Sequence, residues 1–329
     1  MREVGGTARG VHSPAIVGIL RRHVPTRSFE TEAAKPVSIP FVHGRFAVVS
    51  DLQRTSRLEL WRESNPRERA LILRRIAEES PDFVAMLGDL VFRGSSPADW
   101  KEFDRLANPL TREGISVFPI LGNHEYWVSP RLALANYFAR FPRLEGRRWY
   151  AGSYGPLAIL FLDSNRSRMA DAVWKAQIEW YVSALNAAEA DPSVQGILVL
   201  VHHPPYTNST VTSDTIPVQR SIVPPFSAAR KTMMMLSGHV HSYERFARAG
   251  KLFLVTGGGG GPRVRLSTGR RRRHADELFE GPAIRHFHFL SVWLTEEGIA
   301  VSKQAVAKGA EVFEPLDSFL IRWPVSLPP

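Results

Sequence analysis

The sequence predicts an α/β protein, and two features of its pattern indicate that class. Short apolar runs that end in polar residues occur seven times, at residues 46–51, 83–89, 115–125, 157–165, 196–203, 232–241 and 252–259. Continuous apolar runs of this length are typical of strands that are buried on both faces. Helical patterns separate some of the runs, and such an alternation favours sheets covered by helices. The 329 residues provide ample material for a buried core.

Two helices are predicted between these strands. In the first, residues 65–81, Asn65 can cap the start, Pro66 suits the first turn and Pro81 ends the helix. Its inner face is predicted to carry four residues at helical spacing, Leu71, Ile72, Ile76 and Ala77. The second helix spans residues 171–192, and its inner face is predicted to carry Val173, Ile178, Tyr181, Val182 and Leu185.

The C-terminal part of the chain is predicted to add strands and loops. Residues 286–292 alternate in polarity as a strand does, and residues 318–323 are the expected last strand. The glycine-rich segment 256–263 lacks the Lys-Ser/Thr pair of a nucleotide-binding loop, so we expect a flexible turn near the ligand-binding edge of a sheet. The basic run 269–274 has no interleaved aromatic residues and is expected to be a solvated loop rather than a nucleic-acid site.

The composition excludes several kinds of chemistry. The chain has no cysteine, so it has no disulfide, zinc–thiolate site or cysteine nucleophile. Its formal net charge of +10 favours anionic partners, although a solvated arginine-rich surface explains the charge equally well. The apolar patch at residues 15–20 is too short for a transmembrane helix or an ordinary secretory signal. We therefore expect residues 1–40 to be a flexible extension and residues 324–329 a short tail, with a cytoplasmic location favoured over export.

Metal-ligand residue types follow five of the predicted strands. The residues are Asp51, Asp89, Asn123, His124, His202, His239 and His241. Because ligands of α/β sheets bind beyond the carboxyl ends of the strands, we expect these side chains to meet there. One strand can end in Asp simply because Asp starts turns, but five such ends are hard to explain in that way. Oxygen and imidazole donors without thiolate suit Mn, Fe or Zn, and this number of donors is typical of a two-metal site.

These residues lie in motifs that resemble the calcineurin-like metallophosphoesterase superfamily. The motifs are SDLQ, LGDLVF, LGNHEYW, VHHPPY and SGHVH, in the family's order. The segments HHPPYTN (202–208) and QIEWY (177–181) are similar to the purple acid phosphatase branch. The resemblance covers about residues 41–323, and it implies a four-layer α/β/β/α sandwich of two mixed sheets flanked by helices.

The resemblance also implies a binuclear metal centre. One ion would be held by Asp51, Asp89 and His241. The other would be held by Asp89, Asn123, His202 and His239, so that Asp89 bridges the two ions. A hydroxide between the ions would attack phosphorus, and His124 would donate a proton or a hydrogen bond to the leaving oxygen.

Two positions depart from the family pattern. Gln53 stands where many members have histidine in their first motif, and it is predicted either to bind the first ion through its amide oxygen or to hold a metal-bound water. Phe92 stands where purple acid phosphatases have a tyrosine ligand, so the colour of an Fe(III)–tyrosinate centre is not expected.

The substrate is less well defined by the sequence. The candidates for lining the pocket are Arg54, Tyr126, His203 and Tyr206. We expect hydrolysis of phosphate esters with a preference for monoesters, and the alternative is a phosphodiesterase or nuclease of the same fold, which the positive charge favours. A catalytically weak module that binds metal or a polyanion is a third hypothesis, against which the intact His124 argues.

Overall fold

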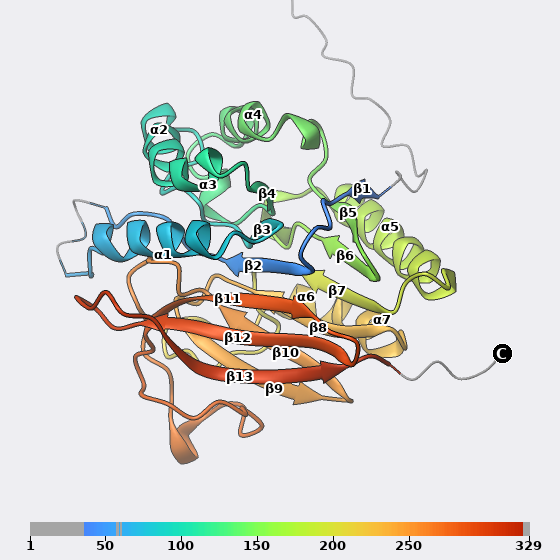
Figure 1. The fold of residues 1–329 in the computed structure, drawn as a ribbon. Coiled ribbons are helices and arrows are strands. Elements are labelled where there is room, and N and C mark those ends of the chain that lie inside the picture. Colours follow the sequence, from blue (N-terminus) through green and yellow to red (C-terminus); the bar gives the residue numbers. More distant parts are fainter. Residues whose placement is uncertain (1–35, 57–58, 60, 325–329) are drawn as a thin grey trace, which may run out of the picture. The chain divides into compact units, whose positions relative to one another are not determined.

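The computed structural model describes residues 36–56, 59 and 61–324, in which two mixed sheets are flanked by helices (Figure 1). The α/β sandwich expected from the sequence is confirmed. Most of the predicted N-terminal extension and nearly all of the predicted tail lie outside the described residues. Within the described part of the chain, no helix is both long enough and apolar enough to cross a bilayer.

The first sheet has six strands in the order β13-β12-β11-β2-β3-β4. Its strands are β2 (Arg45–Val49), β3 (Phe83–Met86), β4 (Ser116–Pro119), β11 (Phe287–Leu294), β12 (Gly298–Val306) and β13 (Glu314–Arg322). Strands β2, β3 and β4 are parallel to one another, whereas β11, β12 and β13 form an antiparallel extension beside β2. The carboxyl ends of the three parallel strands therefore meet at one edge of this sheet.

The second sheet has seven strands in the order β1-β5-β6-β7-β8-β10-β9. Its strands are β1 (Val37–Ser38), β5 (Tyr150–Tyr154), β6 (Leu157–Phe161), β7 (Gly196–Leu200), β8 (Thr232–Ser237), β9 (Tyr243–Arg248) and β10 (Lys251–Thr256). Strands β6, β7, β8 and β10 run parallel, so this sheet also brings strand carboxyl ends together.

The helices cover the sheets (Figure 1). The α-helices are α1 (Pro66–Glu79), α2 (Pro97–Leu106), α3 (Asn108–Arg112), α4 (Pro130–Arg140), α5 (Asp171–Ala190), α6 (Ile216–Ser221) and α7 (Val223–Ala228). Single turns of 3-10 helix lie at η1 (His124–Tyr126), η2 (Pro142–Leu144), η3 (Arg166–Arg168) and η4 (Gly269–Arg271).

Strand β7 shows why the apolar runs of the sequence are continuous. Ile197 and Val199 belong to the core that the seven-stranded sheet forms with α5, α6 and α7. Leu198 and Leu200 point the other way, into the core that the two sheets share. Because successive side chains of a strand point to opposite faces, a sheet buried on both sides needs apolar residues at every position.

Several local predictions need correction. Asn65 occupies the N-cap position of α1 as predicted, but its side chain makes no capping hydrogen bond and its amide nitrogen donates to the backbone oxygens of Gly260 (3.2 Å) and Gly261 (3.3 Å). The glycine-rich loop that accepts these bonds was expected to be a flexible turn, and its residues 256–262 are buried. On α5, Tyr181 and Leu185 are buried as predicted, but the buried face also contains Trp174, Gln177 and Ala188, whereas Val173, Ile178 and Val182 are only half-buried.

Candidate metal centre

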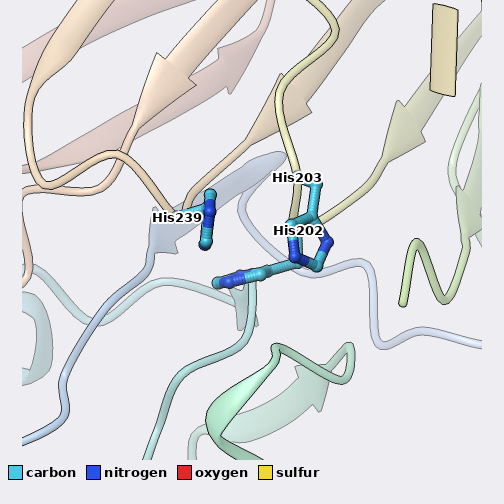
Figure 2. A group of neighbouring side chains, drawn as sticks. All are labelled: His202, His203 and His239. Carbon is cyan, nitrogen blue, oxygen red and sulfur yellow. The ribbon is translucent and has the colours of Figure 1, made fainter. Parts of the chain in front are cut away.

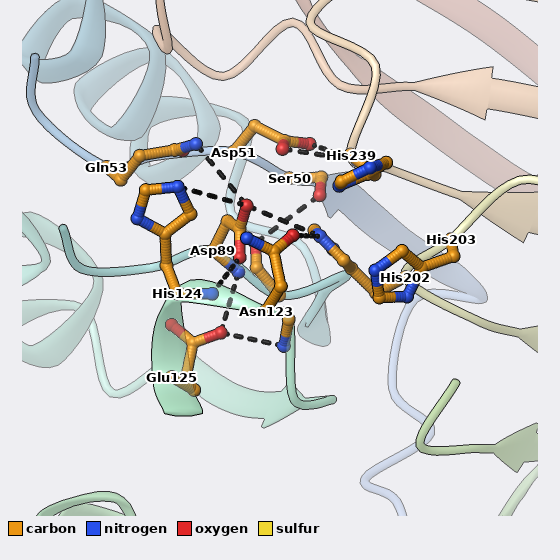
Figure 3. A network of polar contacts seen from close by, with 12 residues as sticks. Ser50, Asp51, Gln53, Asp89, Asn123, His124, Glu125, His202, His203 and His239 are labelled. Atoms are coloured by element: carbon orange, nitrogen blue, oxygen red, sulfur yellow. Dashed lines mark hydrogen bonds and ion pairs between the residues drawn. The ribbon is translucent and has the colours of Figure 1, made fainter. Parts of the chain in front are cut away.

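The predicted ligand residues lie just beyond the carboxyl ends of strands from both sheets. Asp51, Asp89 and Asn123 follow the parallel strands β2, β3 and β4 of the six-stranded sheet. His202 and His239 follow β7 and β8 of the seven-stranded sheet. Figure 3 shows these side chains pointing toward one another, with Asp89 in their midst. Two sheets therefore contribute to one cluster.

The backbone at this edge is strained at three of the ligand candidates. Asp51, Asp89 and His239 adopt left-handed conformations with φ values of 59°, 53° and 67°. Residues other than glycine rarely adopt such angles, and those that do are concentrated at functional sites. A side chain at Gly122 would also clash, because an added Cβ would lie 2.3 Å from the backbone nitrogen of Asp89. These backbone conformations and close approaches direct the side chains of several ligand candidates toward the same place.

One part of the cluster gathers around Asp51. The Nε2 atom of His241 lies 3.3 Å from Oδ1 of Asp51. The side-chain amide of Gln53 has one orientation that satisfies both of its ends. In that orientation its nitrogen donates to the backbone oxygens of Asp51 (3.2 Å) and Asp89 (3.1 Å), and its oxygen lies 2.9 Å from His241 Nε2.

The other part of the cluster gathers around Asp89. The Nε2 atom of His202 lies 3.3 Å from Oδ2 of Asp89 and 3.1 Å from Oδ1 of Asn123. The rings of His202 and His239 are 5.1 Å apart between their centroids. The side chain of Asp89 is almost fully buried, and the backbone oxygen of Asp89 accepts from the amide nitrogen of Gln53, which links it to the first group.

Backbone carbonyl groups fix the tautomers of two histidines. Nδ1 of His202 lies 2.7 Å from the backbone oxygen of Leu87, and Nδ1 of His241 lies 2.8 Å from that of Pro262. A carbonyl oxygen only accepts hydrogen bonds, so each Nδ1 carries a hydrogen. In the neutral ring the lone pair is then on Nε2, the atom that faces Asp89 or Asp51. Metal-binding histidines are commonly oriented by a hydrogen bond of this kind.

The charges in the cluster are arranged for binding cations. Burial opposes the charged form of Asp89, but the facing imidazoles of His202 and His124 lower the pKa of its carboxyl group. Burial likewise opposes the charged form of His202, and the carboxylate of Asp89 overcomes it and raises the pKa of His202. Burial and the neighbouring His202 lower the pKa of His239 to about 4, so His239 is neutral at pH 7. The cluster thus offers the ionised carboxylate of Asp89 beside the neutral imidazole of His239.

The residues of the cluster fit metal ions. Candidate ligand atoms of Asp51, Asp89 and His202 lie within 4.8 Å of one another. Around His241, the Nε2 lone pair, the Gln53 oxygen and an Asp51 oxygen converge, and only a proton or a cation can hold three acceptors together. Oxygen and imidazole donors are those that Mn, Fe and Zn accept.

His124 lies beside the cluster but makes different contacts. Its backbone nitrogen donates to Oδ1 of Asp89 (2.9 Å), and its Nδ1 donates to the backbone oxygen of Phe92 (2.7 Å). Its Nε2 faces Asp89 Oδ2 at 3.9 Å, and the imidazole stacks on Trp127 with ring centroids 3.7 Å apart. The ring is therefore held with one nitrogen directed toward the cluster.

Glu125 has a positioning role that the sequence pattern did not reveal. Its fully buried carboxylate accepts hydrogen bonds from the backbone nitrogens of Asp89 (2.8 Å), Leu90 (2.8 Å) and Gly122 (2.7 Å). These bonds join the loop after β3 to the loop after β4, and Figure 3 shows the Glu125 carboxylate below Asp89 and His124. An acidic residue directly after the Asn-His pair was the only sequence signal for it.

The four residues predicted to line the pocket have different environments. Arg54 lines a cavity of about 270 Å³ at the cluster, together with Gln53, Asp89, Asn123, His124, His239 and His241. Tyr126 does not reach this cavity, because it is buried and its hydroxyl donates to Asp163 (2.5 Å). Tyr206 also lies away from the cavity and packs against the guanidinium group of Arg248.

His203 lies behind the two histidine ligand candidates rather than in the cavity lining. Figure 2 shows the imidazoles of His202, His203 and His239 next to one another, and one ring nitrogen from each lies within 4.8 Å of the others. Ser164 Oγ accepts the backbone hydrogens of both His202 (3.1 Å) and His203 (2.9 Å), and it lies 2.9 Å from Nδ1 of His203. With its acceptor capacity filled, Ser164 donates to that nitrogen, so the hydrogen of the neutral His203 ring is on Nε2.

Comparisons with known proteins agree with this geometry. The family model for calcineurin-like phosphoesterase matches residues 44–243. No curated protein matches the chain. The solved structures that it resembles include GAP50, the anchor in the inner membrane complex of Plasmodium, with 16% identity and a TM-score of 0.63 over 85% of this chain and 88% of that one.

Two phosphatases have the same fold. Purple acid phosphatase PPD1 from yellow lupin seeds has 17% identity and a TM-score of 0.64, over 87% of this chain and 55% of that one. A dimetal phosphatase from Danio rerio has 14% identity and a TM-score of 0.58, over 85% of this chain and 98% of that one. At these identities the likeness establishes the fold, and the family match covers the segment that contains the ligand candidates.

Proposed function

Because the chain belongs to the calcineurin-like phosphoesterase family and is accordingly a metal-dependent phosphoric ester hydrolase, we propose that it works through two metal ions and prefers phosphate monoesters. The observation that carries this proposal is the convergence of carboxylate, amide and imidazole donors from both sheets around Asp89. Asp89 has a donor group on either side, as a bridging carboxylate requires.

The ligands divide into two sets in this proposal. The first ion is held by Asp51, Gln53, Asp89 and His241. The second is held by Asp89, Asn123, His202 and His239. When bound, Mn, Fe or Zn ions at these positions lower the pKa of water to supply a nucleophile and neutralise charge on the phosphoryl oxygens.

Gln53 is assigned as a ligand rather than as the holder of a water molecule. Two backbone oxygens, those of Asp51 and Asp89, hold its amide nitrogen, and the amide oxygen is then directed at the metal-binding nitrogen of His241. A side chain fixed at its nitrogen end presents its oxygen without further ordering, which favours direct binding.

The catalytic residue contributed by the chain is His124. Its Nδ1–H bond to the oxygen of Phe92 and its stacking on Trp127 fix the direction of Nε2. From that position Nε2 can donate a proton to the oxygen that leaves phosphorus. Beside the ligand candidates, a cavity of about 270 Å³ can receive the phosphoryl group of the substrate.

The experiment that tests this function compares His124→Ala with the unchanged protein. Both proteins are dialysed against Mn, Zn or Fe, and metal content and hydrolysis of a mono-aryl phosphate are measured. Loss of general acid catalysis costs about 10²–10⁴ in rate, so kcat is expected to fall by that factor while both ions remain bound. Unchanged turnover would refute the role of His124, and a protein that binds metal but hydrolyses no ester would refute the function.

The alternative is a phosphodiesterase or nuclease of the same fold. The net charge of +10 supports it, because an excess of positive charge attracts polyanions. Hydrolysis of a bis-aryl phosphate is measured beside that of the mono-aryl phosphate. A large preference for the diester would establish this alternative and overturn the preference for monoesters.

A further inference from the structure

We propose that the cavity selects phosphate esters whose leaving group is a single uncharged aromatic ring. This inference rests on the proposed function and concerns the part of the substrate that departs, which neither the metal ligands nor the family match defines. Three observations carry it: the lining of the cavity, the direction of His124 and the pairing of the charges at the cavity.

The cavity has an aromatic group beside the ligand candidates. Phe92 and Trp127 both line it, and their rings are 5.3 Å apart in an edge-to-face arrangement. The imidazole of His124 contacts both rings, at 5.5 Å from Phe92 and 3.7 Å from Trp127 between centroids. Val211, Val264 and Pro262 add further apolar surface to the lining. Aromatic and aliphatic groups of this kind favour a flat apolar ligand over a hydrated one.

The position of His124 places the leaving group next to these rings. Nδ1 of His124 is held by the oxygen of Phe92, so Nε2 is the nitrogen that can reach the leaving oxygen. A group bonded to that oxygen extends from Nε2 into the space that Phe92 and Trp127 line. The cavity of about 270 Å³ therefore brings the first group of the leaving alcohol against these two rings.

The charges at the cavity disfavour an anionic leaving group. Its two arginines are both paired: Nη2 of Arg54 lies 2.9 Å from Asp99, and Nη1 of Arg62 lies 3.0 Å from Glu59. Arg54 also stacks on Phe92, with its guanidinium carbon 5.2 Å from the ring centroid. Among the described residues that line this cavity, a carboxylate therefore offsets the charge of each arginine, which weakens the attraction for a second phosphate or a carboxylate.

The test compares how the metal-loaded protein hydrolyses three esters: phenyl phosphate, hexafluoroisopropyl phosphate and 4-carboxyphenyl phosphate. The first two have parent alcohols of similar acidity, so a difference in kcat/KM reports recognition of the ring rather than leaving-group chemistry. The third adds a negative charge to the ring. We expect phenyl phosphate to exceed the other two in kcat/KM by about fivefold to tenfold, the range of a good aromatic contact.

Variants separate binding of the ring from positioning of His124. Trp127→Leu keeps apolar volume but removes the ring, and it is expected to reduce kcat/KM for phenyl phosphate more than for the fluoroalkyl ester, so that the ratio between the two esters falls. Trp127→Phe is expected to restore the preference. The matched control is Trp180→Leu, on α5 at the core between the seven-stranded sheet and its helices. It is expected to leave the ratio of kcat/KM between phenyl phosphate and each of the other two esters unchanged.

A binding measurement supplies a readout that does not depend on turnover. Phenylphosphonate and cyclohexylphosphonate have phosphorus–carbon bonds that the enzyme does not hydrolyse, and calorimetry gives their affinities. The unchanged protein is expected to bind the phenyl compound about fivefold to tenfold more tightly, and Trp127→Leu is expected to remove that difference.

The outcomes distinguish this inference from the function on which it rests. An equal loss for both uncharged esters in Trp127→Leu would show that Trp127 only positions His124, and it would overturn the inference but leave the hydrolase intact. Faster hydrolysis of the carboxyphenyl ester than of phenyl phosphate would also overturn it. Failure to hydrolyse any of the three esters would overturn the proposed function itself.

Discussion

Single hydrogen bonds decide which nitrogen of each histidine is available at the centre. The carbonyl groups of Leu87 and Pro262 direct Nε2 of His202 and His241 to the carboxylates. Ser164 does the opposite at His203, because it donates to Nδ1 and leaves the hydrogen on Nε2. His203 is therefore a hydrogen-bond donor rather than a further ligand, although it neighbours two ligand candidates.

Gln53 gives the clearest prediction at the scale of one residue. If its amide oxygen binds the first ion, Gln53→Ala is expected to bind one ion per chain where the unchanged protein binds two. Gln53→His is expected to keep both ions and to hold the first more tightly, since imidazole is the stronger donor. The measurement is elemental analysis after dialysis against limiting Mn or Zn.

A matched control for this series is Gln219→Ala. Gln219 is a half-buried glutamine that bonds the backbone oxygen of Pro205 and the carboxylate of Asp214, outside the centre. It is expected to keep both ions. Two ions of unchanged affinity in Gln53→Ala would show that Gln53 is not a ligand and that water completes the first site.

The sequence could predict the ligand candidates but not their supporting partners. Asp51 and Asp89 are recognisable because each follows a buried apolar run with the motif of a known family. The buried partner of Tyr126 is Asp163, in the loop after β6 of the other sheet, and only the packing of the two sheets brings them together. For the same reason the bonds from Asn65 to the loop at Gly260 could not be read from the sequence.

At the scale of elements, the sequence could predict the buried parallel strands, but not the strands whose apolar pattern is interrupted by polar, charged or glycine residues. Strand β12 was missed because Lys303 and Ser302, both buried, interrupt its apolar pattern. Strands β5 and β9 contain glycine, serine or charged residues and were missed for the same reason. Their positions depend on pairing with β6 and β10, which is information that a local pattern does not contain.

Lys303 of β12 gives a prediction about stability. Its side chain is 1% exposed, and its ammonium nitrogen lies 4.6 Å from the ring centroid of Tyr243 and 4.3 Å from that of Phe279. Burial and the nearby charge of Arg285 lower the pKa of Lys303 to about 7, and the carboxylate of Asp317 only partly offsets them. The folded state therefore releases a proton that the unfolded chain holds up to about pH 10.

The sign of the resulting pH dependence follows from proton linkage. Below about pH 7 both states are protonated, and the folded protein bears the full cost of a buried charge. Between about pH 7 and 10 the unfolded state binds more protons, so stability rises with pH. Relative to Lys303→Met, the unchanged protein is expected to gain on the order of 2 kcal/mol between pH 6 and 9.

Urea unfolding in the presence of a chelator measures this difference without a contribution from metal binding. The control is Lys175→Met on α5, where a lysine with a largely exposed side chain pairs with Glu179, and its effect on stability is expected to be nearly independent of pH. If Lys303→Met changed stability equally at pH 6 and pH 9, Lys303 would be charged in the folded state throughout that range.

At the scale of the whole described fold, the centre joins the two sheets. Loops after β2, β3 and β4 supply the carboxylates and the amide, and loops after β7 and β8 supply the imidazoles. Ions at this place bind the folded state and not the separated strands, so they stabilise the fold through mass action. Metal content and resistance to unfolding are therefore expected to change together.

Removal of metal provides the last prediction. At a free ion concentration about 100 times Kd, binding of one ion adds about 2.7 kcal/mol to the free energy of unfolding, so a chelator is expected to lower Tm by about 4 °C in a chain of this size. Asp89→Asn removes the carboxylate that we propose bridges the two ions, at nearly constant volume, and it is expected to make Tm almost insensitive to the chelator. Asp104→Asn, at a half-exposed carboxylate that pairs with Arg140 on the helical side of the fold, is the matched control and is expected to keep the full shift. An equal shift in all three proteins would mean that the chelator acts elsewhere, because a site that depends on Asp89 cannot respond to metal once that carboxylate is gone.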